Sequence, residues 1–128
     1  MKKIVLCGSK KFIPKFFDLE KALKTMGYNV VVPREFIVDM EKKEASLLHF
    51  SEIEKEDVDA LLIVNENKNN QENYIGANGF AELAFGFYKG RKIFLINDIY
   101  EPFAEELVAW EVIPLKGDLS KLKGFIEE

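Results

Sequence analysis

The chain contains very little cysteine and histidine. Its 128 residues include one of each, Cys7 and His49. A single cysteine cannot form an internal disulfide, and it cannot build a cysteine-cluster zinc site. One histidine likewise excludes a histidine-rich metal site. We therefore expect a protein that binds no metal ion and needs no cofactor.

Long apolar runs and an excess of positive charge are also missing. No apolar run approaches the roughly 20 residues that span a bilayer. The apolar run within the opening segment MKKIVLCG is too short for a secretory signal peptide. The 18 Lys and Arg residues are outnumbered by 22 Asp and Glu residues, whereas nucleic-acid binding needs a cationic face. We therefore expect a cytoplasmic protein that binds neither membranes nor nucleic acid polymers.

The composition that remains is that of a globular protein. Apolar residues make up 48% of the chain and charged residues 31%, which is typical of neither disordered nor fibrous proteins. A chain of this length suits one domain and buries roughly two thirds of its unfolded surface, enough for a real core. We expect a single domain over residues 1–128.

Five short apolar segments predict β-strands, and segments of helical periodicity separate them. The predicted strands cover residues 4–7, 29–32, 60–64, 93–96 and 112–113. The predicted helices cover roughly residues 14–26, 38–57, 78–88, 102–109 and 118–126, where 38–57 is either one long helix or a helix pair. Short strands that are apolar throughout, each followed by a helix, are typical of a parallel sheet with helices on both faces. We therefore predict a doubly wound α/β fold of the flavodoxin or Rossmann-like type, with five parallel strands in the order 2-1-3-4-5.

Two loops are expected to meet where such a sheet binds ligands, beyond the carboxyl ends of the first and third strands. One is the turn after the first strand, where Gly8 permits close approach of the main chain. Ser9 adds a hydroxyl and Lys10 a positive charge, next to a helix N-terminus that attracts anions. An ordinary turn with solvated lysines accounts for the same residues. The turn matches neither the G-x-G-x-x-G fingerprint nor the Walker P-loop, which disfavours dinucleotides and ATP.

The second loop leads to Glu82, the only charged residue in the segment NYIGANGFAELAFGFY. A carboxylate among apolar neighbours is costly to bury unless it is used or satisfied. If the helix begins near residue 78 or 79, Glu82 lies in its first turn, where it either faces a ligand or closes a capping box on a main-chain amide. The glycines and asparagines around it favour a shaped binding loop: Asn73, Gly76, Asn78, Gly79 and Gly86.

Four other residues have structural roles as their first interpretation. Asp59 directly precedes the third strand, so it belongs at the amino end of the sheet, where it is expected to end the preceding helix. His49 is expected on a helix face and Cys7 in the core. Trp110 is expected in packing or at a subunit interface.

A family resemblance is carried by three segments: KIVLCGSKKF, DALLIVN and NYIGANGFAELAFGFYKGRKIFLIN. They are similar to the nucleoside 2-deoxyribosyltransferase-like family, which includes the 2′-deoxynucleoside 5′-monophosphate N-hydrolases. The resemblance runs in order from Lys3 to about Leu119, and its most specific part is the Gly-rich loop, helix and strand from Gly76 to Ile96. It implies cleavage or transfer at the N-glycosidic bond of a nucleoside or nucleotide.

The resemblance also implies roles for individual residues. Glu82 is expected to attack the anomeric carbon and to form a glycosyl-enzyme intermediate, as the carboxylate does in retaining glycosidases. Protonation of the leaving base is carried over to Asp59, and we add Tyr74 as a second group that can deliver this proton. The turn that contacts the sugar and base corresponds to three residues: Cys7, Gly8 and Ser9.

The chain departs from the family pattern in two places. Lys10 stands where the hydrolases tend to have an apolar residue. The second aspartate of the transferases and the phosphate-contacting serine of the hydrolases are absent, and Asn73, Gly76 and Asn78 stand in that loop. The alternative is therefore a non-catalytic nucleotide-binding or sensing module on the same fold.

Other readings of the fold receive less support. A receiver domain needs acidic residues after the first strand and a flavodoxin needs a phosphate loop there, and the turn Gly8-Ser9-Lys10 provides neither. Family members are dimers or larger, so the resemblance implies a homodimer or higher homo-oligomer. The apolar residues Phe85, Phe87, Tyr88 and Trp110 fit either a helix-mediated interface or the core.

Overall fold

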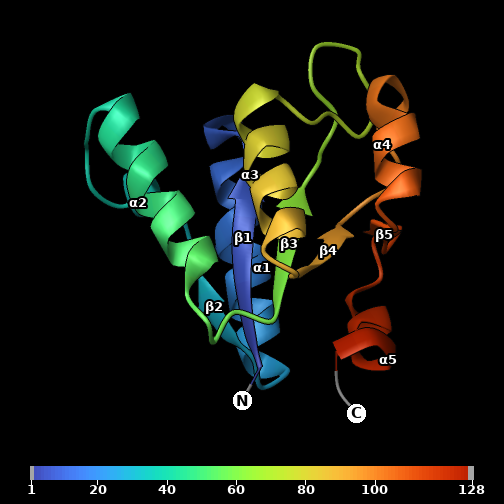
Figure 1. The fold of residues 1–128 in the computed structure, drawn as a ribbon, viewed down its shortest axis with the longest axis horizontal. Coiled ribbons are helices and arrows are strands. Elements are labelled where there is room, and N and C mark those ends of the chain that lie inside the picture. Colours follow the sequence, from blue (N-terminus) through green and yellow to red (C-terminus); the bar gives the residue numbers. More distant parts are fainter. Residues whose placement is uncertain (1, 127–128) are drawn as a thin grey trace.

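The fold is an α/β sandwich built on one five-stranded parallel sheet. The computed structural model describes residues 2–126, and Figure 1 shows the strands side by side in the order β2-β1-β3-β4-β5. The predicted fold class and strand order are thereby confirmed. The strands are β1 (Lys3–Gly8), β2 (Asn29–Val31), β3 (Ala60–Val64), β4 (Lys92–Leu95) and β5 (Ile113–Pro114).

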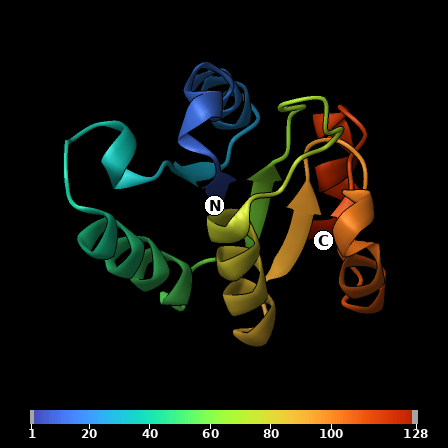
Figure 2. The same cartoon turned by 90° about the horizontal axis from the view of Figure 1, so that it is seen from above.

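Helices cover both faces of this sheet. Viewed from above in Figure 2, α1 lies on one face, while α2, α3 and α4 lie side by side on the other. Packing places α5 on the face of α1, because Ile126 shares a hydrophobic cluster with Phe16. The helices are α1 (Ile13–Thr25), α2 (Lys42–Glu54), α3 (Ala77–Tyr88), α4 (Ala104–Ala109) and α5 (Lys123–Ile126), and short 3₁₀ turns are η1 (Lys10–Phe12), η2 (Arg34–Phe36), η3 (Glu101–Phe103) and η4 (Leu119–Leu122).

Two hydrophobic cores result, one on each face of the sheet. Side chains alternate along β1, so that Ile4 and Leu6 enter the core under α1, whereas Val5 and Cys7 enter the core under α2, α3 and α4. All four are fully buried. Strands buried on both faces have no polar side to show, which is why they are apolar throughout the sequence. No helix within residues 2–126 combines the length and the apolar character that crossing a bilayer requires.

Several helices are shorter than the sequence pattern predicts. The segment over residues 38–57, predicted as one long helix or a helix pair, contains the single helix α2 from Lys42 to Glu54, and Lys55 already has an extended backbone. The segments that begin at Pro102 and Asp118 each open with a 3₁₀ turn before the α-helix. Helix α3 begins at Ala77, which places Glu82 in its second turn and not in its first.

A glycine sets how closely α3 approaches the sheet. A Cβ atom built on Gly86 would lie 2.5 Å from Cδ2 of Leu61 and 3.3 Å from Cδ1 of Ile93. Since Leu61 is fully buried in β3, its side chain has no free space to move into. The close contact fixes the position of α3, and with it the position of Glu82 above the carboxyl ends of β1 and β3.

We expect Gly86→Ala to lower the free energy of unfolding by about 1–3 kcal/mol, the usual cost of overpacking a well-packed core. Gly124→Ala is the matched control, because nothing lies within 4 Å of a Cβ at that position. Its stability should stay within about 1 kcal/mol of wild type. Urea unfolding of both variants measures the difference, and equal stabilities would show that α3 does not depend on this contact.

Candidate functional site

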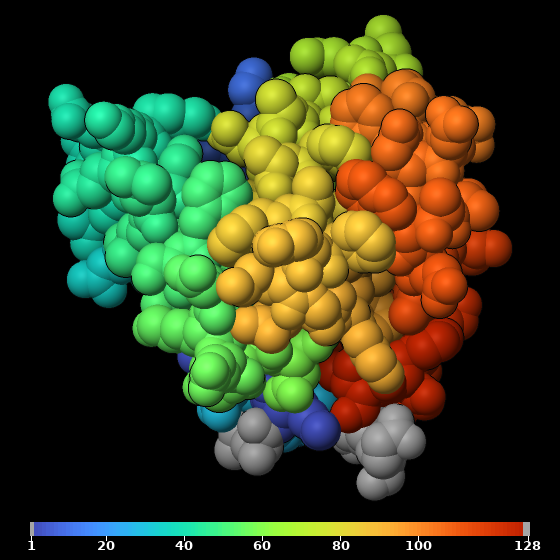
Figure 3. Space-filling view, in the orientation of Figure 1, coloured from blue at the N-terminus to red at the C-terminus, as the bar shows by residue number. Residues whose placement is uncertain are grey.

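A pocket of about 630 Å³ opens at the carboxyl end of β1. In the space-filling view of Figure 3 a hollow separates the teal segment before and within α2 from the yellow first turns of α3. Its walls come from the turn after β1, the segment 33–42, the loop 65–76 and α3. The lining residues are Gly8, Ser9, Lys10, Lys11, Pro33, Glu35, Met40, Lys42, Lys68, Tyr74, Gly76, Ala77, Asn78, Gly79 and Glu82.

Glu82 is a largely buried carboxylate that lines this pocket. Its side chain is 13% exposed, and its Oε1 lies 3.7 Å from Nε2 of His49. Burial raises the pKa of Glu82 from 4.5 to about 8, a shift that the thiol of Cys7 and the ammonium of Lys42 oppose and the carboxylate of Glu35 reinforces. In the unliganded protein the group is therefore mostly protonated at pH 7.

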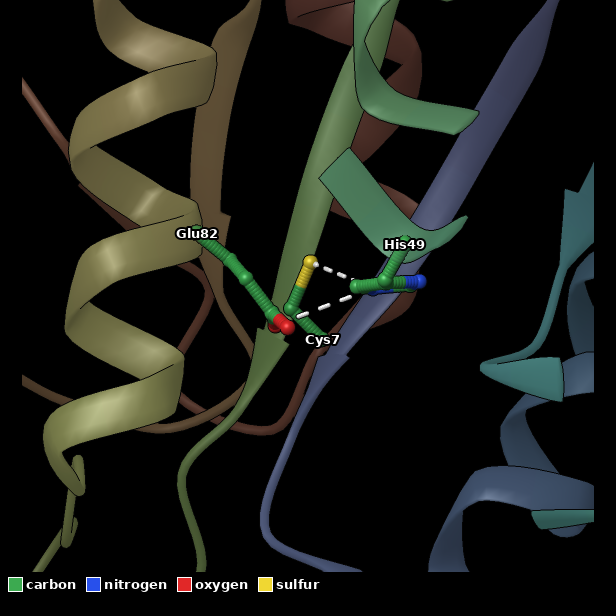
Figure 4. Close-up of side chains that lie close together, drawn as sticks. All are labelled: Cys7, His49 and Glu82. Carbon is green, nitrogen blue, oxygen red and sulfur yellow. Dashed lines mark hydrogen bonds and ion pairs between the residues drawn. The ribbon is translucent and has the colours of Figure 1, made fainter. Parts of the chain in front are cut away.

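Cys7 and His49 complete a compact cluster behind Glu82. Figure 4 shows the three side chains pointing toward one another from β1, α2 and α3. The Sγ atom of Cys7 lies 3.5 Å from Nε2 of His49. Burial lowers the pKa of His49 to about 4, against a smaller opposing effect of the Leu6 carbonyl. The contact between His49 and Glu82 consequently joins two neutral groups at pH 7 and is not an ion pair.

The thiol of Cys7 is also held in its neutral form. The residue is fully buried, and burial raises its pKa well above the ordinary value, with Glu82 adding to the shift through its charge and a hydrogen bond. A neutral thiol is a poor nucleophile. Cys7 is thus a core residue that forms the back of the site without lining the pocket, so its predicted contact with the sugar and base is not supported.

Glu82 does not form a capping box at the start of α3. The N-cap of α3 is Gly76, and no side chain caps this end of the helix. Glu82 lies one turn further on and contacts Cys7 and His49. The acid therefore faces the cluster and the pocket, and it does not serve to begin the helix.

Charge around the pocket is positive, in contrast to the chain as a whole. Four lysines line it, against the two carboxylates Glu35 and Glu82, while the whole chain carries a net charge of −4. A concave surface that gathers one sign of charge raises the local concentration of ligands of the opposite sign. The four lysines, Lys10, Lys11, Lys42 and Lys68, thus favour an anionic ligand.

Most of the residues that the sequence singles out lie together around this pocket. The turn after β1 brings Gly8, Ser9 and Lys10 to one side, where Ser9 also caps η1 by accepting a hydrogen bond from the amide of Lys11. The N-terminal end of α3 packs closely against this turn, because a Cβ on Gly79 would lie 3.9 Å from the Cα of Gly8. The loop before α3 and α3 itself form the opposite side of the pocket, with Tyr74, Gly76, Asn78, Gly79 and Glu82.

Asp59 does not belong to this group, so its placement in the catalytic site is wrong. It directly precedes β3, whose five residues separate it from the pocket, a distance of about 17 Å along the strand. Its Oδ2 accepts a hydrogen bond of 2.8 Å from the main-chain amide of Lys3. Asp59 thus joins the amino ends of β1 and β3, and it does not end α2, which stops at Glu54.

Asn73 also lies away from Glu82, in a second groove of about 750 Å³. Its backbone has a left-handed φ of 58°, and its side chain bonds the segment after β4, where its Oδ1 accepts from the amide of Asp98. The fully buried Asn65 donates to the carbonyls of Asn73 and Asp98. Asn73 therefore holds the loop 65–76 in place, and its predicted role in binding the substrate at the Glu82 pocket is not supported.

Two residues of the site were not selected from the sequence. His49 was expected on a helix face in a structural role, yet it is 5% exposed and its Nε2 lies 3.7 Å from Oε1 of Glu82. Glu35 follows β2, the strand beside β1. Because the carboxyl ends of neighbouring parallel strands share one edge of the sheet, the position of Glu35 was a signal that could have found it.

Trp110 has the packing role that was one of its two predicted interpretations. Its ring stacks on Phe87 with centroids 4.8 Å apart, and on Phe80 at 5.7 Å. These contacts join α3 to the end of α4, on the side of α3 away from His49.

Comparisons with known proteins add no relative to this description. A scan of protein-family profiles, a search of curated proteins and a search of solved structures each found no match.

Proposed function

We propose that the protein cleaves, or transfers a group at, the N-glycosidic bond of a nucleoside or nucleotide, with Glu82 as the nucleophile. One observation carries the proposal: a single carboxylate is shielded from water in an apolar wall and still lines a pocket of about 630 Å³. A volume of this size accommodates a small-molecule ligand. The resemblance of the sequence to N-glycosidic enzymes supports the same reaction.

The reaction needs little more than this carboxylate. An oxygen of Glu82 forms a bond to C1′ of the sugar as the bond from C1′ to the base nitrogen breaks, through an oxocarbenium-like state that the negative charge stabilises. The departing base takes up a proton. Water, or a second base, then displaces Glu82 from C1′ and regenerates the carboxylate.

Tyr74 is the group placed to give the leaving base its proton. Its side chain lines the pocket with Glu82, whereas Glu35 lines the pocket as the negative charge that, in addition to burial, raises the pKa of Glu82 and therefore has no proton to donate. Proton donation requires hydrogen-bond reach of the substrate, which Asp59 at the far end of β3 does not have. We assign the acid role to the hydroxyl of Tyr74.

A pair of variants separates Tyr74 from Asp59 as the proton donor. Tyr74→Phe should lower the rate of base release by about 10²-fold or more, the usual contribution of a general acid. Asp59→Asn should keep the rate within about twofold, and because the amide oxygen can still accept a hydrogen bond from the Lys3 amide, it should cost under about 1 kcal/mol of stability. Steady-state rates at saturating substrate measure both. Loss of turnover in Asp59→Asn with turnover kept in Tyr74→Phe would reverse the assignment.

The lysines of the pocket favour a phosphorylated substrate. A 5′-monophosphate carries charge that Lys10, Lys11, Lys42 and Lys68 can neutralise, and the first turn of α3 adds main-chain amides. We therefore expect nucleotides to be better substrates than the corresponding nucleosides.

The test is a panel of ribo- and deoxyribonucleosides and their 5′-monophosphates, incubated with the protein and analysed by chromatography for free base. Base release by wild type, and its absence with Glu82→Gln, is the expected result. A panel in which no compound loses its base would overturn the enzymatic proposal.

A non-catalytic nucleotide-binding module is the second candidate, and one observation favours it. Burial raises the pKa of Glu82 to about 8, so the unliganded protein holds only a minor fraction of the ionised nucleophile at pH 7. If this candidate is correct, nucleotides raise the melting temperature while every base stays attached, at pH 9 as well as at pH 7.

Self-association is also proposed, through the outer surface of α3 and α4. Phe87, Tyr88 and Val108 are 42%, 83% and 67% exposed there. Exposed apolar residues grouped on one surface often mark a protein interface. Sedimentation equilibrium of wild type and Tyr88→Glu measures the expected dimer and its weakening.

A further inference from the structure

Cys7, His49 and Glu82 bring three different metal-binding atoms to one point. The thiol sulfur, the imidazole Nε2 and a carboxylate oxygen all lie within 4.8 Å of one another. They come from β1, α2 and α3, three elements far apart in the sequence, and Figure 4 shows the side chains converging. We propose that these three residues bind a divalent transition-metal ion of the zinc class.

The distances between the ligand atoms fit such an ion. Zinc bonds of about 2.3 Å to sulfur and about 2.0–2.2 Å to nitrogen and oxygen place tetrahedral ligands about 3.3–3.6 Å apart. In the protein the sulfur lies 3.5 Å from Nε2 of His49, and Nε2 lies 3.7 Å from Oε1 of Glu82. The sulfur and the carboxylate oxygen lie within 4.8 Å of each other, so a movement of the Glu82 carboxylate by up to about 1 Å brings all three atoms into bonding distance.

The orientation of His49 supplies the right nitrogen. Its Nε2 faces both Cys7 and Glu82, and its Nδ1 is buried without a hydrogen-bond partner among the described residues. A proton on Nδ1 leaves the lone pair of Nε2 for the cluster, which is the tautomer that metal binding through Nε2 requires.

The charge balance favours a divalent ion in this buried place. Cys7 binds as a thiolate and Glu82 as a carboxylate, whereas His49 binds as the neutral imidazole. The two negative charges cancel the charge of +2 on the ion, and the displaced protons go to solvent. The ion and its three ligands together carry no net charge, so no unpaired charge is buried.

The set of ligands also selects the kind of ion. A thiolate and an imidazole suit zinc and cobalt, whereas magnesium and calcium prefer oxygen ligands only. Glu82 lines the pocket and the other two residues lie behind it. An ion therefore enters from the pocket, and a water or an anion from the pocket completes its coordination, as in zinc sites with three protein ligands.

Metal binding and glycosidic cleavage compete for the same carboxylate. An oxygen bound to the ion cannot attack C1′, so zinc is expected to inhibit base release. This consequence rests on the proposed function, but the metal site itself does not, and the two are tested separately.

The experiment uses untagged, metal-free protein titrated with Co²⁺ and followed by absorption. A thiolate bound to cobalt gives a charge-transfer band in the near ultraviolet, and this band can come only from Cys7 because the chain has one cysteine. We expect the band to saturate at one ion per chain and to disappear on addition of Zn²⁺. Absence of the band in folded wild type would overturn the proposal.

Variants then identify the other two ligands. Glu82→Gln and His49→Gln should each weaken Zn²⁺ binding at least tenfold in calorimetry, and Cys7→Ser should remove the cobalt band. Glu44→Gln is the matched control, an exposed acid on the same helix as His49, and it should bind as wild type does. Equal zinc affinity in all four variants would place the ion elsewhere on the surface. Thermal melts check that each variant is folded, and the wild-type cobalt spectrum decides the matter if one is not.

Discussion

Glu82→Gln is expected to slow base release by about 10³-fold or more, because it removes the atom that forms the bond to C1′. The same substitution should raise the free energy of unfolding at pH 7 by about 3 kcal/mol. The wild-type carboxyl has to take up a proton on folding at that pH, because its pKa rises from 4.5 to about 8. The amide of glutamine has nearly the shape of the protonated acid and needs no proton.

Single-turnover rates and urea unfolding measure these two effects side by side. Glu72→Gln is the matched control, since Glu72 is exposed in the loop that leads to α3 and does not line the Glu82 pocket. It should keep the wild-type rate. A folded Glu82→Gln protein that turns over within tenfold of wild type would remove Glu82 from the reaction.

The second large effect is a dependence on pH that acts in opposite directions on activity and on stability. Attack on C1′ requires the ionised carboxylate, and the pKa of Glu82 in the free protein is about 8. We therefore expect kcat/KM to rise with pH and to level off above about pH 8, since this ratio reports groups of the free enzyme. A plateau already reached at pH 6 would contradict the buried, protonated state of Glu82.

Stability should fall over the same range. The pKa of Glu82 is raised from 4.5 to about 8 on folding, so its contribution is complete below pH 4.5 and is lost as the pH rises through about 8. The lowered pKa of His49, about 4 against 6.5, acts oppositely and only below pH 6.5. Between pH 6.5 and 8 Glu82 acts without His49, and we expect a loss of about 2 kcal/mol, at about 1.4 kcal/mol per pH unit.

Glu82→Gln serves as the control for this trend, because glutamine does not titrate. Urea unfolding at several pH values from 6.5 to 8 should give a falling free energy for wild type and a flatter one for the variant. The difference between the two curves removes the contribution of every other group. Parallel curves would show that Glu82 has an ordinary pKa.

The sheet could be predicted from the sequence because its strands are buried on both faces. The runs Ile4–Cys7 and Ala60–Val64 are apolar without interruption, and strands alternating with helices leave few possible orders. Glu82 could be found for a related reason. A single charge in a long apolar segment has to be used or satisfied, and here it lies beside a pocket.

His49 could not be found in this way because α2 does not bury its most apolar residues. Leu47 and Leu48 are exposed, while Ala45, His49 and Ile53 form the buried stripe at spacings of four residues. The apolar pattern alone therefore predicts that the face of α2 with Leu47 and Leu48 is buried, which is the wrong face. Only the packing of α2 against α3 decides which face turns inward.

Asp59 and Asn73 were misplaced for different physical reasons. The position of Asp59 before β3 already indicated the amino end of the sheet, and the family resemblance assigned it a role that this position does not allow. The path of the loop 65–76 depends on side-chain hydrogen bonds over long sequence separations, such as that of Asn65 to Asp98. Local patterns carry no information about such bonds.

The most direct measurement of the central claim is intact-protein mass spectrometry after rapid acid quench of a reaction with the best substrate, followed by peptide mapping. We expect a mass increase equal to the sugar without its base, located on the peptide that contains Glu82 and absent in Glu82→Gln. Base release without any adduct, or with an adduct on another residue, would contradict the role of Glu82 as the attacking group.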